Sequence, residues 1–420
     1  MVSSVTDTTI DKVPTPAPPV MPPDAPRPTW WAVVIAGVSI ALLAAIAISS
    51  LVPSRWFATT ENARLMEDQP APYARIPASA ESVNDRVEFN DLPDDVVRYE
   101  TADDFFFVTV SAPEQSALSW LLGLSEPTVD LLTEEDKFGR RTPTQSRQLS
   151  LQQMRTATQE AQYLALLTAG YEPTIERGEV VIQDILCRVP DESGLECIES
   201  FPSDEQLDPA DTILEIEGRP IGDLNDLTDE LAGRSPGDEI DMRIRRPGVG
   251  ELDVTIELSS DPQDPDRTIV GFIPFDTATV DLPFDVSIDT GPIGGPSAGL
   301  AFTLALIDEL TEGELTGGRN IAVTGTIDLQ GNVGPIGGLE QKVHAVQQHG
   351  VDVFLVPASQ IELSEPDPDN PDDGICRIEC LRRAGKDQVE IIAVATLDDA
   401  LAALVELGGD PVVPVDAAAS

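Results

Sequence analysis

Residues 291–310 read GPIGGPSAGLAFTLALIDEL, a turn of small residues that leads into an apolar run. A strand is expected before this turn and a helix over 298–310 after it. The small residues on both sides of Ser297 leave the backbone open, so another chain can approach closely. Such a strand-to-helix turn is common, and it predicts either an ordinary tight turn or a nucleophile at Ser297.

The residues beside the serine are the candidates for holding an oxyanion. Backbone amides around Ser297, in the loop of Gly295, Pro296 and Ala298, could face a developing negative charge. The N-terminus of the following helix adds a partial positive charge there.

A serine hydroxyl needs a base, and Lys342 is the candidate. It lies in LEQKVHAVQQH, residues 339–349, which predicts a helix with an apolar stripe. The stripe consists of Leu339, Val343 and Val346. Lys342 borders it, roughly 40° around the helix from Val346 at ~100° per residue.

The two histidines fit a base less well. His344 falls roughly 200° from Lys342 on the same helix, so we expect it on the solvent side. His349 comes just before Gly350, where it is expected to cap the helix end.

Only four lysines occur in the chain, which makes Lys342 easier to interpret. A lysine among apolar residues loses solvation of its charged form, so its pKa falls and the amine becomes a usable base. The alternative is a lysine that extends to the surface. The glycine-rich approach GPIGG at 334–338 favours the buried position.

Residues 268–408 resemble the proteolytic domain of the Lon family. Three blocks carry the resemblance: GGPSAGLAFTLALI (294–307), VTGTIDLQGNVGPIGGLEQKV (323–343) and VDVFLVP (351–357). Their order and spacing agree with the family, and the alternation of strands and helices fits an α/β or α+β domain.

The resemblance implies Ser297 as nucleophile and Lys342 as general base. It also implies that Thr324 orients the lysine. The chain departs from the family at Gly294, where many Lon sequences have Asp before Gly-Pro-Ser.

An uncharged stretch of 23 residues, 30–52, is long enough to span a hydrocarbon core of ~30 Å. We expect a single transmembrane anchor at 29–53 in contact with membrane lipid, after a disordered tail at 1–28. The apolar region of a cleaved signal peptide is usually ~7–15 residues, so that alternative is less favoured. The flanking charges do not decide the orientation.

The rest of the chain divides by pattern. Residues 54–170 mix strand and helix without evident chemistry. Residues 171–260 alternate short strands, a helix and a hairpin, and they resemble a PDZ domain, which captures peptides by strand addition. The alternative is a small β-rich spacer. A linker is expected at 261–267, and a tail at 409–420 follows the Lon-like domain.

The composition of the chain limits which partners it is expected to bind. The net charge is −48, so nucleic acid is not expected as a partner. No GxxxxGK[ST] motif occurs, so no P-loop ATPase and no ATP are expected. No cofactor or metal site is predicted.

The four cysteines form two local pairs. We expect disulfides Cys187–Cys197 and Cys376–Cys380 in an oxidising compartment. Free thiols are the next alternative, and a metal site is the weakest. Paired cysteines favour an extracytoplasmic location for the large C-terminal portion.

Together these features predict a multidomain, single-pass protein of the cell membrane. Its function is expected to be ATP-independent serine endopeptidase activity on proteins or unfolded polypeptides at the extracytoplasmic face. The resemblance to the Lon family also suggests a homo-oligomeric ring. The alternative is a non-enzymatic, membrane-tethered scaffold that binds peptides through the PDZ-like region. A trypsin-like protease does not fit, because no histidine precedes His344.

Overall fold

The structure is a computed structural model, and it describes most of the chain. The described residues are 30–61, 68–126, 128–139, 141–190, 197–261, 264, 267–362 and 378–415. The predicted tail at 1–28 lies outside them. Two compact units, divided after Leu51, are described separately below.

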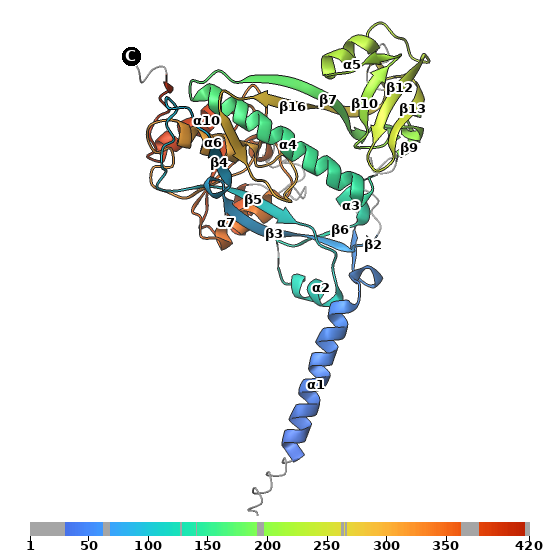
Figure 1. Ribbon diagram of the computed structural model, residues 1–420. Helices are drawn as coiled ribbons and strands as arrows, with labels where there is room; N and C mark the ends of the chain where they lie inside the picture. Colours follow the sequence, from blue (N-terminus) through green and yellow to red (C-terminus); the bar gives the residue numbers. More distant parts are fainter. Residues whose placement is uncertain are drawn as a thin grey trace, which may run out of the picture. The chain divides into compact units, whose positions relative to one another are not determined.

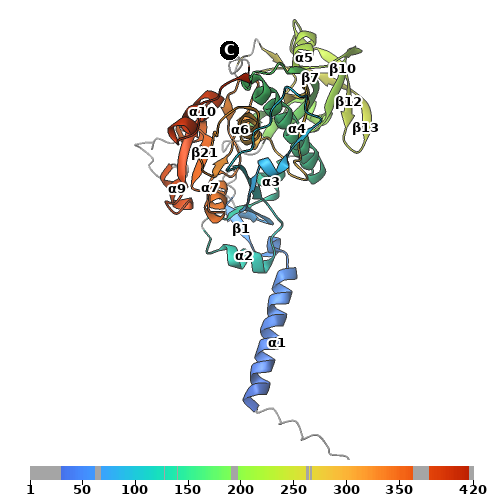
Figure 2. The same cartoon turned by 60° about the vertical axis from the view of Figure 1, so that its left-hand side comes forward.

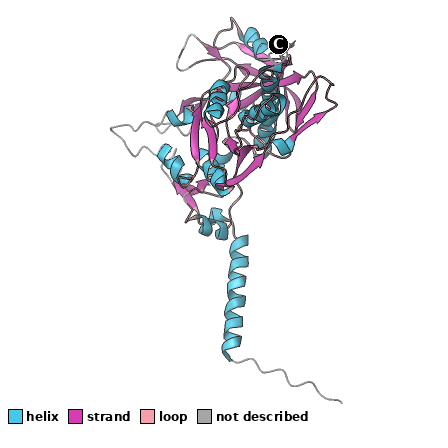
Figure 3. Ribbon diagram, turned by 90° about the vertical axis from the view of Figure 1, so that its left-hand side faces the viewer, coloured by secondary structure: helices cyan, strands magenta, loops and turns pink. Residues whose placement is uncertain are grey.

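The first unit contains one helix, α1 (Trp30–Leu51). Figure 3 shows it as a single long helix, whereas strands and helices alternate in the second unit. In length and composition α1 is suited to cross a membrane, and none of its residues is buried. A helix this apolar and this exposed has no protein core to pack against.

A six-stranded mixed sheet is central to the second unit, in the order β22-β21-β18-β5-β3-β6. Strands β5, β18, β21 and β22 run parallel, and β3 runs antiparallel to both β5 and β6. The bounds are β3 (Tyr73–Ser82), β5 (Phe105–Ser111), β6 (Asp130–Leu132), β18 (Ile321–Val323), β21 (Val353–Pro357) and β22 (Glu390–Val394). Half of this sheet therefore comes from the region expected to be separate at 54–170.

Side chains alternate between the two faces of this sheet, as the strand period requires. Phe105, Ile321 and Val353 belong to a core with α6 (Gly299–Leu310), α4 (Pro143–Thr168) and α10 (Leu397–Glu406). Ala322 and Phe354 belong to a second core with α7 (Leu339–Gln348) and α9 (Ile378–Ala384). Figure 2 shows α7, α9 and α10 beside β21.

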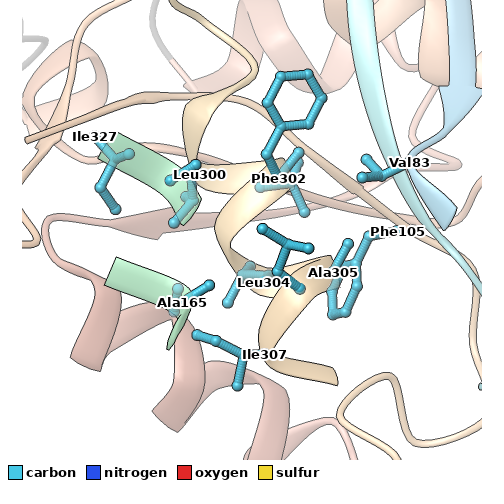
Figure 4. Packing of buried hydrophobic residues seen from close by; sticks show 14 of the residues in the cluster. Val83, Phe105, Ala165, Leu300, Phe302, Leu304, Ala305, Ile307 and Ile327 are labelled. Atoms are coloured by element: carbon cyan, nitrogen blue, oxygen red, sulfur yellow. The ribbon is translucent and has the colours of Figure 1, made fainter. Parts of the chain in front are cut away.

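Helix α6, which follows Ser297, is buried along its whole length. Figure 4 shows Phe105 and Val83 beside Phe302 and Ala305 of this helix. A helix with apolar residues on all its faces packs in a core, and here burial also includes Asp308 and Glu309 near the end of the helix.

Helix α4 begins with a capping box of Thr142 and Gln145, with Pro143 at its first position. These signals start the helix at Pro143. Its buried residues Ala157, Ala161 and Leu164 pack beside α6. Figure 1 shows α4 running between the central sheet and the second sheet.

The second sheet has the order β13-β12-β10-β7-β16. Its strands are β7 (Thr174–Ile185), β10 (Thr212–Ile216), β12 (Glu239–Arg246), β13 (Gly250–Glu257) and β16 (Phe272–Asp281). One apolar core joins this sheet to α5 (Leu224–Leu231). The strands, helix and hairpin expected over 171–260 are present in that order.

Strand β16 lies beyond the expected linker at 261–267 yet pairs with β7 along nearly its whole length. The sheet of the PDZ-like region therefore includes a strand from the Lon-like region. Within the expected linker, only Asp261, Asp264 and Arg267 are described, and the Arg267 carbonyl accepts a hydrogen bond from Asp261 N–H.

Smaller elements complete the unit. The helical ones are η1 (Ser54–Trp56), η2 (Asn84–Arg86), η3 (Pro202–Glu205), α2 (Ala117–Gly123), α3 (Glu134–Phe138) and α8 (Ser359–Glu362). The strands are β1 (Thr59–Glu61), β2 (Asp68–Pro70), β4 (Val87–Asn90), β8 (Cys187–Pro190), β9 (Cys197–Ser200), β11 (Arg219–Pro220), β14 (Ser259–Ser260), β15 (Thr268–Ile269), β17 (Asp285–Ile288), β19 (Thr326–Ile327) and β20 (Val333–Gly334).

The two predicted disulfides stay predictions. Cys187 and Cys197 lie on the antiparallel pair β8 and β9, but their side chains are outside the described residues. Cys376 and the side chain of Cys380 are likewise outside them. Part of the expected C-terminal tail contacts the body, because Val415 N–H donates to the Ala169 carbonyl at 2.9 Å.

Asp308, near the end of α6, is a buried acid with a hydrogen bond to only one of its two carboxyl oxygens. Its side chain is 1% exposed, and Leu315 N–H donates to Oδ1 at 2.7 Å. Oδ2 has no partner among the described residues. Burial raises the pKa of Asp308 to about 7, and the nearby Glu314 and Glu309 add to the rise.

Replacing Asp308 with Asn is expected to stabilise the fold at alkaline pH. The folded state holds the proton more tightly than the unfolded chain, so the stability it supplies is lost as pH rises through about 7. At pH 8, D308N is expected to gain roughly 2 kcal/mol in the free energy of unfolding, because a neutral amide is cheaper to bury. Urea unfolding from pH 5 to 9 measures this. The exposed Asp352→Asn serves as control, and an equal gain in both variants would contradict the prediction.

Candidate active site

Ser297, Lys342 and Thr324 meet at one point. Lys342 Nζ lies 2.8 Å from Ser297 Oγ and 2.9 Å from Thr324 Oγ1. Thr324 Oγ1 donates to the Ser297 carbonyl at 3.1 Å. The three side chains expected from sequence are therefore in direct contact, although 45 residues separate the serine from the lysine.

Lys342 is enclosed by protein. The residue is 2% exposed, and no described carboxylate forms an ion pair with it. Burial lowers the pKa of Lys342 to about 7, and loss of solvation of the ammonium is the cause. A large fraction of the amine is therefore neutral near pH 7 and can accept a proton from the serine hydroxyl.

Helix α7 carries the lysine and is fixed at its start. Gly338 caps the helix with φ +67°, a left-handed conformation that favours glycine. Gln341 donates to Asp130 of β6 at 2.7 Å. The Gln360 side chain makes two hydrogen bonds of 2.9 Å with the backbone of Ile336 and so holds the preceding loop.

The backbone of Ser297 is held from the strand side. Gly325 N–H donates to the Ser297 carbonyl at 3.0 Å, and Leu300 N–H donates to the Gly325 carbonyl at 3.2 Å. Gly299 has no room for a side chain, since its Cβ would lie 3.0 Å from Ile327 Cγ2 and 3.3 Å from Ile327 N. Close contact between this turn and the Thr324–Ile327 segment therefore fixes the serine opposite the lysine.

Helix α4 packs on the other side of the serine loop. Gly295 N–H donates to the Ser150 carbonyl at 2.8 Å. A Cβ on Gly294 would lie 2.8 Å from Ser150 Cβ, closer than side chains approach one another. Ser150 thus occupies the space that a side chain at 294 would need, which accounts for glycine at this position.

This contact changes the expected oxyanion donors. The Gly295 N–H already donates to the Ser150 carbonyl, and Pro296 has no N–H. The amides of Ser297 and Ala298 have no acceptor among the described residues, and Ala298 is the N-cap of α6. These two amides remain available for an oxyanion, whereas Gly295 contributes through its loop conformation, with φ +92°.

A cavity of about 1030 Å³ opens in front of Ser297 and Lys342. The serine loop and the 335–337 loop form part of its wall. The remainder comes from β3, β5, the end of α3 and the first turns of α4. The region 54–170, where no chemistry was expected, therefore supplies much of the wall.

The position of His344 corrects the sequence prediction. It is 8% exposed rather than on the solvent side, and its Nδ1 lies 3.1 Å from the Ala384 carbonyl of α9. The helical wheel placed it opposite Lys342 correctly, but α9 covers that face of α7. His349 is the C-cap residue of α7 and bonds the Ala345 carbonyl at 2.8 Å, as expected.

Residues 278–405 match the family profile of the Lon protease (S16) C-terminal proteolytic domain. The match includes Ser297, Thr324 and Lys342. The C-terminal part of the chain, residues 278–405, is therefore a proteolytic domain of the Lon type.

Curated relatives agree with this identification. The Lon protease of Roseiflexus castenholzii is 31% identical over 166 residues, which cover 37% of this chain and 19% of that protein. The Lon protease of Haemophilus influenzae is 34% identical over 121 residues, which cover 29% of this chain and 13% of that protein. The chain thus spans less than a fifth of the length of these relatives.

Solved structures similar to this chain include the PDZ domain of an SdrC-like protein from Listeria monocytogenes. It is 16% identical, covers 24% of this chain and 92% of that domain, and has a TM-score of 0.19. The corresponding domain from Listeria innocua is 17% identical. It covers 22% of this chain and 92% of that domain, with a TM-score of 0.16.

The lowered pKa of Lys342 predicts how Ser297 reacts with pH. Acylation of Ser297 by a serine-directed probe should rise with pH and level off above about 7, because only the neutral amine can take the proton. The initial labelling rate between pH 5 and 9 measures this. K342M should lower the rate about 100-fold or more at every pH. The exposed Lys386→Met is the control, and an unchanged profile in K342M would contradict the role.

The contact of Gly294 with Ser150 predicts a coupled pair of substitutions. G294A should lower the labelling rate about tenfold, because the new Cβ must displace α4 or the serine loop. Adding Ser150→Gly removes the opposing Cβ and should restore part of the rate, although glycine inside a helix costs about 1 kcal/mol of stability. The four labelling rates form a double-mutant cycle. Simple additivity of the two effects would refute the contact.

Proposed function

We propose that the chain is an ATP-independent serine endopeptidase that cuts proteins or unfolded polypeptides with a Ser297–Lys342 dyad. The observation that carries this is the enclosed amine of Lys342, 2.8 Å from Ser297 Oγ. A buried neutral amine beside a serine hydroxyl is suited to acyl transfer.

The first half of the reaction is attack. Neutral Lys342 takes the hydroxyl proton as Ser297 Oγ bonds to the peptide carbonyl carbon. Thr324 positions the amine, because its hydroxyl accepts from Nζ and donates to the Ser297 carbonyl. The amides of Ser297 and Ala298 are the nearest donors for the oxyanion that forms.

The second half is release. The protonated Lys342 gives its proton to the leaving amine as the C–N bond breaks, which leaves an ester on Ser297 Oγ. Water then attacks this ester while Lys342 accepts its proton, and Lys342 returns the proton to Ser297 Oγ as the acyl C–O bond breaks. The enzyme returns to its starting state with one peptide bond hydrolysed.

Independence from ATP is supported by the sequence, which contains no GxxxxGK[ST] motif. We propose that α1, within 29–53, anchors the protein in the cell membrane with the remaining chain extracytoplasmic. Protease protection of sealed vesicles measures that orientation. The region 171–260 is proposed as a PDZ-like module for substrates, and a homo-oligomeric ring is proposed from the family.

Cleavage of an unfolded protein tests the function. The detergent-solubilised full chain should cut reduced casein without added nucleotide, and S297A should lose at least 1000-fold of the rate because no nucleophile remains. The exposed Ser235→Ala is the matched control, and circular dichroism checks the fold. Peptide binding without any Ser297-dependent cleavage would favour the scaffold instead.

A further inference from the structure

The cavity in front of Ser297 carries two cationic side chains that the reaction does not use, Lys137 and Arg147. We propose that they select substrates with an acidic side chain close to the cleaved bond. This inference rests on the proposed peptidase function and names a substrate class for it.

Arg147 is placed by helix α4. The residues of this helix that line the cavity recur at one-turn spacing: Pro143, Ser146, Arg147, Ser150 and Met154. The Ser150 carbonyl bonds Gly295, two residues before the nucleophile. Arg147 is three residues earlier on the same face, ~4.5 Å along the helix axis. Its long side chain therefore starts within a turn of the serine loop.

The guanidinium of Arg147 has no polar partner among the described residues. It has no hydrogen bond or ion pair to any residue that the structure describes. Other arginines nearby are paired, as Arg141 is with Asp184 and Arg246 with Asp211. In a chain of 74 acidic and 26 basic residues, a free arginine at the cavity wall has its five N–H donors available for a carboxylate from outside.

Lys137 lies in the same wall, at the end of α3. Its Nζ donates to the Ala112 carbonyl at 2.7 Å and lies 3.8 Å from the centre of the Tyr73 ring. An ammonium has three donors, so this arrangement fixes its position and leaves further N–H groups for a ligand. No ion pair joins it to a carboxylate in the described part of the chain.

The acidic side chain that lines the cavity, Glu81, is already neutralised. It accepts hydrogen bonds from Arg86 and, at 2.6 Å, from Ser79 Oγ. Arg86 in turn bonds the Asp289 carbonyl at 2.7 Å. The uncompensated charge in the cavity is therefore positive, although the whole chain carries −48. A local field of this kind attracts a carboxylate once it enters the cavity.

Paired peptides test the inference with the detergent-solubilised full chain. Two fluorogenic peptides differ only in Glu or Gln within two residues of the cleaved bond. The wild type should cut the Glu peptide with a kcat/KM about tenfold higher, and R147Q and Lys137→Gln should each bring the ratio several-fold closer to one. The ratio should also fall between 50 and 500 mM salt, because exposed charges are screened.

The control is Arg155→Gln, two turns further along α4. Arg155 is exposed and unpaired among the described residues, but it lines other cavities and not this one. Its substitution should leave the Glu-to-Gln ratio as in the wild type. A ratio near one in the wild type, or an equal change in R147Q and Arg155→Gln, would overturn the inference while leaving Ser297-dependent cleavage in place.

A binding measurement separates the two proposals further. In S297A, fluorescence anisotropy should show the labelled Glu peptide binding several-fold more tightly than the Gln peptide, and R147Q should remove the difference. This result supports the acidic preference even if turnover is slow. Equal affinities in S297A would overturn it, whatever the rate of cleavage by the wild type.

Discussion

The amine of Lys342 is almost completely buried, and much of the surrounding structure packs around it. An enclosed ammonium without a carboxylate partner is costly, so the fold favours the neutral amine. The enclosure requires α7 on one face of the sheet, α6 on the other and the 324–327 segment between them. A glycine cap, two glutamine side chains and the Thr324 hydroxyl then fix where the amine points.

The serine is positioned by two unrelated contacts. From one side, Thr324 and Gly325 hold its carbonyl. From the other, the Ser150 carbonyl in α4 holds the amide of Gly295. The second contact comes from a segment that lies outside the matched residues 278–405. The same helix places Arg147 at the cavity wall, so one element both supports the Ser297 loop and supplies positive charge to the cavity.

Ser297 and Lys342 can be predicted as a pair from the sequence because their signals are local. A serine between glycines before an apolar helix, and a rare lysine beside an apolar stripe, can be read in short windows. Thr324 required the family resemblance. The contributions of Ser150, Lys137 and Arg147 could not be read, because they depend on pairing between β5 and β18, more than 200 residues apart. His344 was misplaced for the same reason, since a helical wheel does not show that α9 packs on the polar face.

The pairing of β5 with β18 also has a consequence for biosynthesis. The central sheet contains strands from both sides of the PDZ-like region. A growing chain that ends before about residue 357 therefore lacks all or part of β21 and the whole of β22. Ser150 emerges from the ribosome well before Ser297, and Ser297 well before Lys342. Lys342 can contact Ser297 only after the strands of the second sheet, the last of which ends at Asp281, have been synthesised. The contact between Ser297 and Lys342 therefore forms late in synthesis, so a chain released early holds the serine without its amine neighbour.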